Sequence, residues 1–177
     1  MLLNRDEIRA LIEEQGLISN YVDLDTQLQP GGFDLTLREV HSFASGGSVD
    51  FSNLERVIAS TEPFLSDFDG WYWMPEGSYI VVYNEDVMMP LDVAAMARTR
   101  STLLRNGAVI ETAVWDPGYN GRSSSLLVVH NPYGIRFKKD ARIAQLIFFR
   151  IDKVGEGYTG VYQNERLGKP PSKPRKT

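Results

Sequence analysis

The sequence predicts a domain built mainly of β-strands, and two observations lead to that class. Runs rich in β-branched and aromatic residues, such as YIVVY (79–83) and SLLVVHN (125–131), recur with Gly, Pro, Asn or Asp between them. Strands do not alternate regularly with helices, and the loops G-x-x-x-x-G-K-[ST] and G-x-G-x-x-G are absent. Short strands with frequent turn signals are typical of a β-barrel or a β-sandwich.

Two helices interrupt this pattern. The first is expected over 4–15, because Asn4 can cap it, Glu7 completes a capping box and Gly16 suits its end. The second is short and lies within RTRSTLLRNG (98–107), where Thr99 or Ser101 is suited to cap its start. The other predicted strands are 33–37, 108–115 and 141–151, and the irregular stretch 44–70 is expected to be an excursion on the surface.

Composition limits the class of protein. A chain of 177 residues fits one domain, and the absence of cysteine excludes a disulfide framework and thiol chemistry. No apolar run approaches the ~18–20 residues that span a bilayer, and the first residues lack a signal-peptide pattern, so we expect a cytoplasmic protein without a membrane partner.

Charge is distributed unevenly along the chain. The last eleven residues, LGKPPSKPRKT (167–177), carry four basic groups and no acid, which predicts a disordered basic tail after a single domain at 1–166. The remaining 15 basic residues face 23 acidic ones. Such an acidic body argues against nucleic acid as a partner.

The stretch VWDPGYNG (114–121) is the first candidate site. Asp116, Pro117 and Gly118 are the residues that a tight turn requires, so a simple corner between strands explains them. The flanking Trp115 and Tyr119 have no role in such a turn. The alternative is a corner that carries a reactive carboxylate with an aromatic ring beside it.

The predicted second helix offers a candidate anion site. The residues at its start offer backbone N–H groups, two guanidinium groups and two hydroxyl groups, which suit an anion: Arg98, Arg100, Ser101 and Thr102. A capped turn with solvated arginines is the other interpretation of the same residues.

Five stretches resemble, in order, the motifs of the dUTPase and dCTP deaminase superfamily, and they are closest to archaeal dUTPases of the dCTP deaminase branch. The resemblance implies a distorted β-barrel (β-clip) that assembles as a homotrimer, with active sites shared between subunits and a deoxynucleoside triphosphate as substrate. The stretches are QPGGFDLTL (29–37), RTRSTLLRNG (98–107), TAVWDPGYNG (112–121), ARIAQLIFF (141–149) and GYTGVYQNER (157–166).

The resemblance also implies roles for single residues. Asp116 matches the aspartate of the nucleotide-hydrolysing motif, and Tyr119, with Trp115 beside it, matches the aromatic position against the deoxyribose. Asp34 is an outer-sphere partner of Mg²⁺ or, equally well, a structural aspartate at a strand start. The implied phosphate-binding residues are Arg100, Ser101, Thr102, Arg105 and Gln145, and the implied lid residues are Tyr158, Tyr162 and Gln163.

This superfamily performs two reactions, hydrolysis and deamination. The zinc route to deamination needs a His/Cys/Cys or Cys₃ site, whereas this chain has no cysteine and only His41 and His130. Zinc-free deaminases use a glutamate on the strand after the turn, where this chain has Val128 and no acidic residue from Arg122 to Lys139. An apolar side chain cannot carry protons.

The sequence therefore predicts a dUTP diphosphatase, a nucleotide pyrophosphohydrolase that converts dUTP and water to dUMP and pyrophosphate with Mg²⁺. In this reading Asp116 orients the attacking water. Two alternatives stay open: a dCTP deaminase, alone or combined with hydrolysis, and a nucleotide-binding module without turnover.

Overall fold

The structure is a computed structural model that describes residues 1–167, so the predicted tail lies outside the described residues except for Leu167. Within that range no helix is long and apolar enough to cross a membrane. The elements are α1 (Arg5–Gln15), β1 (Ile18–Ser19), α2 (Leu24–Gln27), β2 (Leu28–Gln29), β3 (Gly32–Phe43), β4 (Thr61–Phe64), β5 (Trp71–Met74), β6 (Gly77–Tyr83), β7 (Asp86–Met88), β8 (Val93–Thr99), α3 (Ser101–Arg105), β9 (Ala108–Glu111), β10 (Val114–Trp115), β11 (Asn120–Gly121), β12 (Ser124–Val129), β13 (Ile135–Lys138) and β14 (Arg142–Arg150).

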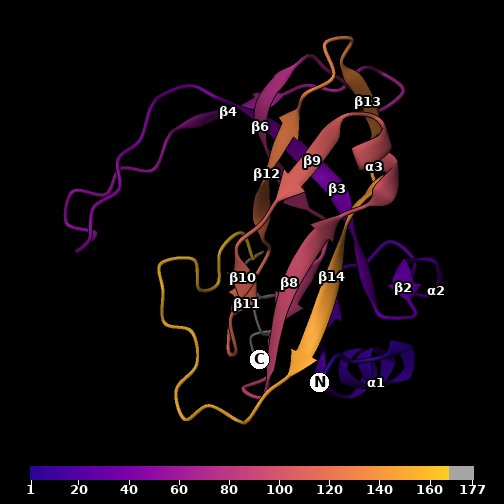
Figure 1. Ribbon diagram of the computed structural model, residues 1–177, viewed down its shortest axis with the longest axis vertical. Coiled ribbons are helices and arrows are strands. Elements are labelled where there is room, and N and C mark those ends of the chain that lie inside the picture. Colours follow the sequence, from indigo (N-terminus) through magenta and orange to yellow (C-terminus); the bar gives the residue numbers. More distant parts are fainter. Residues whose placement is uncertain (168–177) are drawn as a thin grey trace, which may run out of the picture.

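A curled antiparallel sheet forms the body and confirms the predicted class (Figure 1). Among the described residues it has nine strands, seven of them in the order β10-β8-β14-β3-β6-β12-β9, with β2 and β4 attached to β3. The two ends of this path, β9 and β10, are consecutive in the chain and separated by Thr112 and Ala113 alone. The predicted strand 108–115 is therefore two strands, which join opposite ends of the sheet and curl it into a partial barrel.

A side chain bridges the open seam of this barrel. The hydroxyl of Thr99, at the end of β8, accepts a hydrogen bond from the Ile110 N–H (2.8 Å) and donates one to the Ile110 carbonyl (3.0 Å) on β9. Thr99 therefore does not cap α3, and Ser101 does not cap it either, so the predicted caps were wrong. Arg100 occupies the N-cap position without a side-chain hydrogen bond, while Gly107, with φ of 72°, follows the helix as expected.

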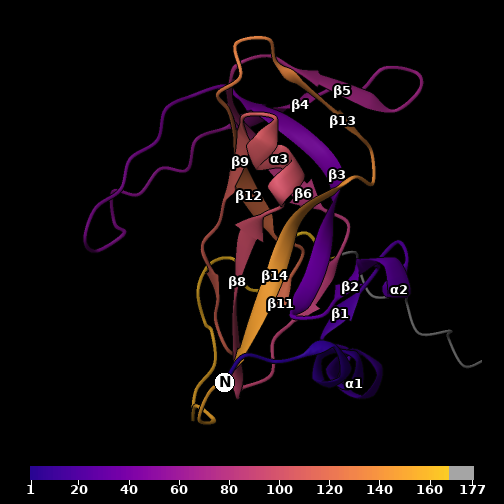
Figure 2. The same cartoon turned by 45° about the vertical axis from the view of Figure 1, so that its right-hand side comes forward.

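Local signals explain α1. Asn4 accepts hydrogen bonds from the N–H groups of Asp6 and Glu7, the Glu7 carboxylate accepts one from the Asn4 N–H, and Gly16 takes the left-handed conformation at the end. The helix buries its apolar stripe, including Ile8 and Leu11, and lies across one end of the sheet (Figure 2). The expected helix is confirmed.

A buried carboxylate joins β3 to the segment that follows β6. Glu85 is fully buried, and its oxygens accept hydrogen bonds from the Thr36 N–H (3.0 Å), the Thr36 hydroxyl (2.6 Å) and the Gln27 amide (2.6 Å). Burial raises the pKa of Glu85, against the opposing effect of these donors. Because all three partners donate, only a group that accepts at both oxygens satisfies them.

We expect Glu85→Gln to lower the free energy of unfolding by about 1–3 kcal/mol, since the amide N–H₂ must face one of these donors in either orientation. Thermal or urea unfolding measures the change. The exposed Glu76 provides the matched control, and Glu76→Gln should leave stability unchanged. Equal stability of the two variants would contradict this account of Glu85.

Candidate functional site

The corner between β10 and β11 holds Asp116 outward on a rigid base. The Tyr119 N–H donates to the Asp116 carbonyl (3.1 Å), and Gly118 has φ of 81°, as the predicted turn requires. Trp115 is buried and its indole N–H donates to the Ser123 hydroxyl (2.7 Å). Asp116 itself is exposed, and within residues 1–167 its carboxylate takes part in no hydrogen bond or ion pair.

Tyr119 lies beneath this corner. Its ring is buried. Its hydroxyl lies 3.0 Å from the Ser123 hydroxyl and donates a hydrogen bond to the Glu165 carboxylate (2.9 Å). The Tyr158 ring meets it edge-on at 5.7 Å between ring centres. Burial raises the pKa of Tyr119 well above its usual value, so it stays a neutral phenol at physiological pH. Sequence reasoning missed Ser123 and Glu165, which no local pattern marks.

The segment 157–166, which contains the three predicted lid residues, packs on the corner of its own chain. The Tyr158 N–H donates to the Pro117 carbonyl (2.8 Å). The Gln163 side chain accepts from the Asn120 N–H (3.0 Å) and donates to the Gly118 carbonyl (3.0 Å), as a neighbouring strand would. Tyr162 is exposed. The structure therefore brings Tyr158 and Gln163 to the Asp116 corner, and it leaves Tyr162 at the surface.

The second half of the site surrounds Arg100. Its Nε lies 3.2 Å from an Asp34 carboxylate oxygen, and its Nη1 donates to the Arg142 carbonyl (3.2 Å). Arg142, which sequence reasoning did not single out, contacts the same Asp34 oxygen at 3.2 Å. Asp34 is buried; burial raises its pKa, while the two arginines oppose that rise. The structure thus uses Asp34 to orient two guanidinium groups, and its predicted contact with a metal stays a prediction.

The short helix α3 presents two faces. Ser101 and Arg105, one turn apart, are exposed on one face, whereas Thr102 and Asn106 line a cavity on the next. Gln145 is half-buried on β14 in register with Asp34 of β3. The predicted phosphate-binding residues therefore gather at one end of the sheet, around α3 and the adjoining strands.

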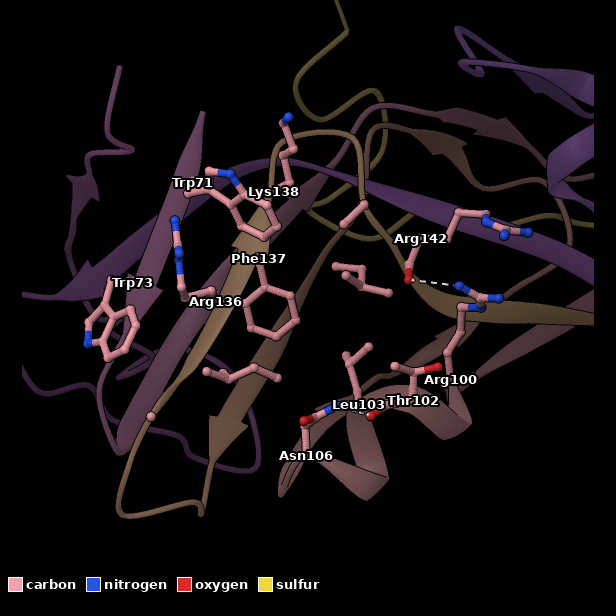
Figure 3. Close-up of a pocket in the computed structure, with 14 residues that line it drawn as sticks. Trp71, Trp73, Arg100, Thr102, Leu103, Asn106, Arg136, Phe137, Lys138 and Arg142 are labelled. Carbon is pink, nitrogen blue, oxygen red and sulfur yellow. Dashed lines mark hydrogen bonds between the residues drawn. The ribbon is translucent and has the colours of Figure 1, made fainter. Parts of the chain in front are cut away.

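The cavity beside α3 has a volume of about 510 Å³, and its opposite wall is the β5–β13 ribbon (Figure 3). The residues that line it include four cationic ones and two tryptophans but no acid: Arg100, Arg136, Lys138, Arg142, Trp71 and Trp73. Asp116 and Tyr119 do not reach it.

One strand separates the two halves of the candidate site. Trp115 pairs with Ala95 on β8, while Arg100 follows the far end of that strand. At ~3.3 Å per residue, Asp116 and Arg100 lie roughly 15–20 Å apart in a single chain. A single chain therefore does not bring the predicted carboxylate and the predicted phosphate-binding groups together.

The described residues also show which side chains could act as ligands of a metal ion. Residues 1–167 contain no group of three or more His, Cys, Asp or Glu side chains placed to hold an ion. A divalent cation at this site therefore fits only if most of its ligands come from phosphate oxygens and water, as Mg²⁺ prefers.

The two arginines that Asp34 fixes at one end of the curled sheet suit an anionic ligand. Comparison with known proteins defines the family: the model of dCTP deaminase-like proteins matches residues 2–151, and this chain belongs to that family.

Relatives extend over nearly the whole chain. A protein of Methanosarcina mazei named probable deoxyuridine 5'-triphosphate nucleotidohydrolase is 51% identical over 93% of this chain and 97% of its own. A deoxyuridine 5'-triphosphate nucleotidohydrolase of Methanocaldococcus jannaschii is 39% identical over 78% of this chain and 88% of its own. The 2'-deoxycytidine 5'-triphosphate deaminase of Agrobacterium tumefaciens superposes with a TM-score of 0.64 at 22% identity, over 85% of this chain and 49% of its own, and this likeness concerns the fold alone.

We expect Gly118→Ala to loosen the segment 157–166. The new Cβ would lie 2.8 Å from the Gly157 Cα and 3.1 Å from the Tyr158 nitrogen, and the positive φ adds roughly 1–2 kcal/mol of strain. Hydrogen exchange should show faster exchange of the Tyr158 amide.

Gly46→Ala is the matched control, because its Cβ would meet nothing within 4 Å. If the Tyr158 amide exchanges at the same rate in the Gly118→Ala protein, the close contact between Gly118 and Gly157 does not hold the segment 157–166 in place.

Proposed function

We propose that this protein is a dUTP diphosphatase that hydrolyses dUTP to dUMP and pyrophosphate. The observation that carries the proposal is the near half-identity, over almost its full length, to archaeal proteins named as nucleotidohydrolases of this substrate. The arrangement of the candidate site supports the same reaction, because it provides a carboxylate for water and cations for phosphates.

Asp116 is the group that acts on water. An exposed carboxylate with no partner in the described chain is free to accept a hydrogen bond from a water molecule and to take its proton. Its position is fixed by the turn hydrogen bond to Tyr119 and by the buried Trp115 next to it. A fixed base holds the attacking oxygen in line with the α-phosphorus, which phosphoryl transfer requires.

Arg100, Ser101 and Gln145 hold the triphosphate, with Thr102 and Arg105 on either side of the same helix. The buried Asp34 keeps the Arg100 guanidinium in one orientation, so little conformational freedom is lost when phosphate binds. When bound, Mg²⁺ would be held mainly by substrate phosphate oxygens and water, and it would neutralise part of the phosphate charge. Asp34, held by Arg100 and Arg142, would contact such an ion only through intervening groups.

Tyr119 and Trp115 form the sugar side of the site. Both side chains hydrogen-bond to Ser123, so their rings are fixed in place. As the resemblance implies, the Tyr119 ring lies against the deoxyribose and excludes a 2′-hydroxyl. Backbone groups around 108–115 read the base, since uracil and cytosine present opposite donor and acceptor patterns. Tyr158, Tyr162 and Gln163 close the site from the segment already packed on the corner.

The complete site is composite, and a homotrimer provides it. Asp116 of one copy and Arg100 of another then meet across the interface. An outward apolar row on the sheet supports such an interface: Val114 pairs with Met96 and Met96 with Ile147, while Val114 and Met96 are 57% and 43% exposed.

Deamination of dCTP is the competing reaction. It is disfavoured because Val128, at the position of the deaminase glutamate, pairs with Val109 and Ser78 and offers no proton-carrying group. Incubation of the purified protein with Mg²⁺ and either dUTP or dCTP, with pyrophosphate and ammonia measured separately, distinguishes the two. Pyrophosphate from dUTP is the expected product, ammonia from dCTP would overturn the assignment, and no product from either would favour a binding module.

We expect Asp116→Asn to fold normally and to lower the turnover of dUTP by roughly 10²–10⁴-fold, the usual contribution of a general base. Steady-state pyrophosphate release measures this loss. Asp152→Asn, at another exposed aspartate, is the control and should retain full turnover. An Asp116→Asn protein within a factor of two of the unaltered enzyme would refute the role of this carboxylate.

A composite site also predicts complementation. Asp116→Asn and Arg100→Ala should each be nearly inactive, but co-refolded in equal amounts they should recover about a quarter of the sites, because some interfaces then pair two intact groups. Activity of the mixture against each parent measures this. A mixture that remains as inactive as its parents would argue that both groups act from one chain.

A further inference from the structure

The segment between β3 and β4, residues 44–60, forms an arm that leaves the body of the molecule (Figures 1 and 2). The outgoing and returning halves of the arm are hydrogen-bonded to each other at two places. At the base the Ala44 N–H donates to the Ser60 carbonyl, and further along Ser48 and Val57 exchange backbone hydrogen bonds of 2.9 and 3.0 Å. The proposed function gives this arm no role.

The arm exposes large apolar side chains that a monomer in water would be expected to cover. Five lie along it with exposed fractions from 56% to 106%: Val49, Phe51, Leu54, Val57 and Ile58. Isolated apolar residues are common on surfaces, but a contiguous set on one projecting segment indicates an interaction surface. Burial stabilises at roughly 25 cal/mol per Å² of apolar area, so a partner surface for this arm is favoured.

Hydrogen bonds within the arm tip hold its turn in one conformation. The Asp50 carboxylate accepts hydrogen bonds from the N–H groups of Ser52 and Leu54, both at 3.1 Å, and this turn displays Phe51 and Leu54 outward. Each of the two apolar residues has an acid as its sequence neighbour, Asp50 before Phe51 and Glu55 after Leu54. The tip thus combines two apolar anchors with negative charge.

The cavity between α3 and the β5–β13 ribbon has the opposite character. Trp71 and Trp73 face outward from β5, with the Arg136 guanidinium 4.6 Å from the Trp71 ring centre and 6.0 Å from that of Trp73, and the Lys138 amine 5.6 Å from Trp71 (Figure 3). Phe137 and other apolar residues form its floor, and no acid is among the described residues that line it. An aromatic or aliphatic anchor with a neighbouring carboxylate suits this lining.

The arm cannot reach this cavity on its own chain. In both views the arm extends to the side of the body away from β13 (Figures 1 and 2). We propose that the arm of one copy of this chain docks its tip, through Phe51 and Leu54, into the basic aromatic cavity of a second copy. The exposed apolar arm and the cavity then cover each other. The cavity has more cations than acids around it even though Asp34 pairs with Arg100 and Arg142, and Asp67 pairs with Arg136.

The absence of cysteine permits a direct test that needs no turnover. A Ser52→Cys protein is mixed with an Asn106→Cys protein under mild oxidation, and a non-reducing gel is searched for a band of twice the mass that neither protein gives alone. Since neither chain holds both thiols, a disulfide between the two variants joins two copies. We expect it to form in the mixture and at least tenfold less when Glu14→Cys, on α1, replaces Asn106→Cys.

The anchors are tested separately in the full chain. Phe51→Ser with Leu54→Ser should weaken self-association about tenfold or more in sedimentation, as the loss of central anchors does. Val22→Ser, at an exposed apolar residue outside the arm, is the control and should leave association unchanged.

Equal cross-linking to positions 106 and 14, or no cross-link in an assembly that persists, would overturn the docking. So would protection of the position 106 thiol from alkylation by pyrophosphate without any cross-link, which would assign the cavity to a small anion. The cross-link does not require turnover, so an inactive protein can give it and an active one can lack it. Because Arg100 and Thr102 line the cavity and also hold the triphosphate in the proposed function, the cross-linking is done without nucleotide or pyrophosphate.

Discussion

The register between β8 and β10 is the constraint on which the candidate site depends. It fixes Trp115 opposite Ala95, and therefore sets the Asp116 corner at one end of β8, while Arg100 and α3 follow the other end. A strand is extended and cannot fold back on itself, so its two ends cannot meet within one chain. The fold thus keeps Asp116 and Arg100 apart within one chain, so the proposed chemistry requires a second copy to bring them together.

Buried polar groups hold each half in place. Asp34 stabilises the positions of Arg100 and Arg142, and Ser123 joins the Trp115 and Tyr119 side chains under the corner. Such groups are costly to bury unless every partner is satisfied, and here their partners come from segments distant in sequence. The same contacts that stabilise the fold therefore determine the directions of the groups that would meet a nucleotide.

Sequence reasoning succeeded where the determining contacts are local. Asn4, Glu7 and Gly16 define α1 within thirteen residues, and the Asp-Pro-Gly turn has the expected geometry. It failed where a distant residue competes: Thr99 was expected to cap α3, but its hydroxyl is bonded to Ile110 on another strand.

The strand β8 and several site residues illustrate the same limit. VAAMART (93–99) has two adjacent alanines and little β-branching, so its pattern is weak, and only pairing with β14 and β10 makes it a strand. Glu165 and Arg142 become visible only through their contacts with Tyr119 and Asp34. No pattern of residue spacing in the sequence predicts those contacts. The motifs suggested both halves of the candidate site, whose roles stay predictions, but the separation of the two halves within one chain required the structure.

The two aspartates that the motifs marked have opposite surroundings, and this contrast supports separate roles for them. Asp34 is buried against two guanidinium groups, so a proton on it would break ion pairs that position Arg100. Asp116 is exposed on a fixed corner and has no partner within residues 1–167, so it can receive a proton without loss of any contact that the fold needs. A general base must be free of other contacts when it accepts a proton, whereas a positioning group must be held by its partners. Asp116 is free, so we assign activation of the water to it. Asp34 is held in ion pairs, so we assign to it the orientation of Arg100.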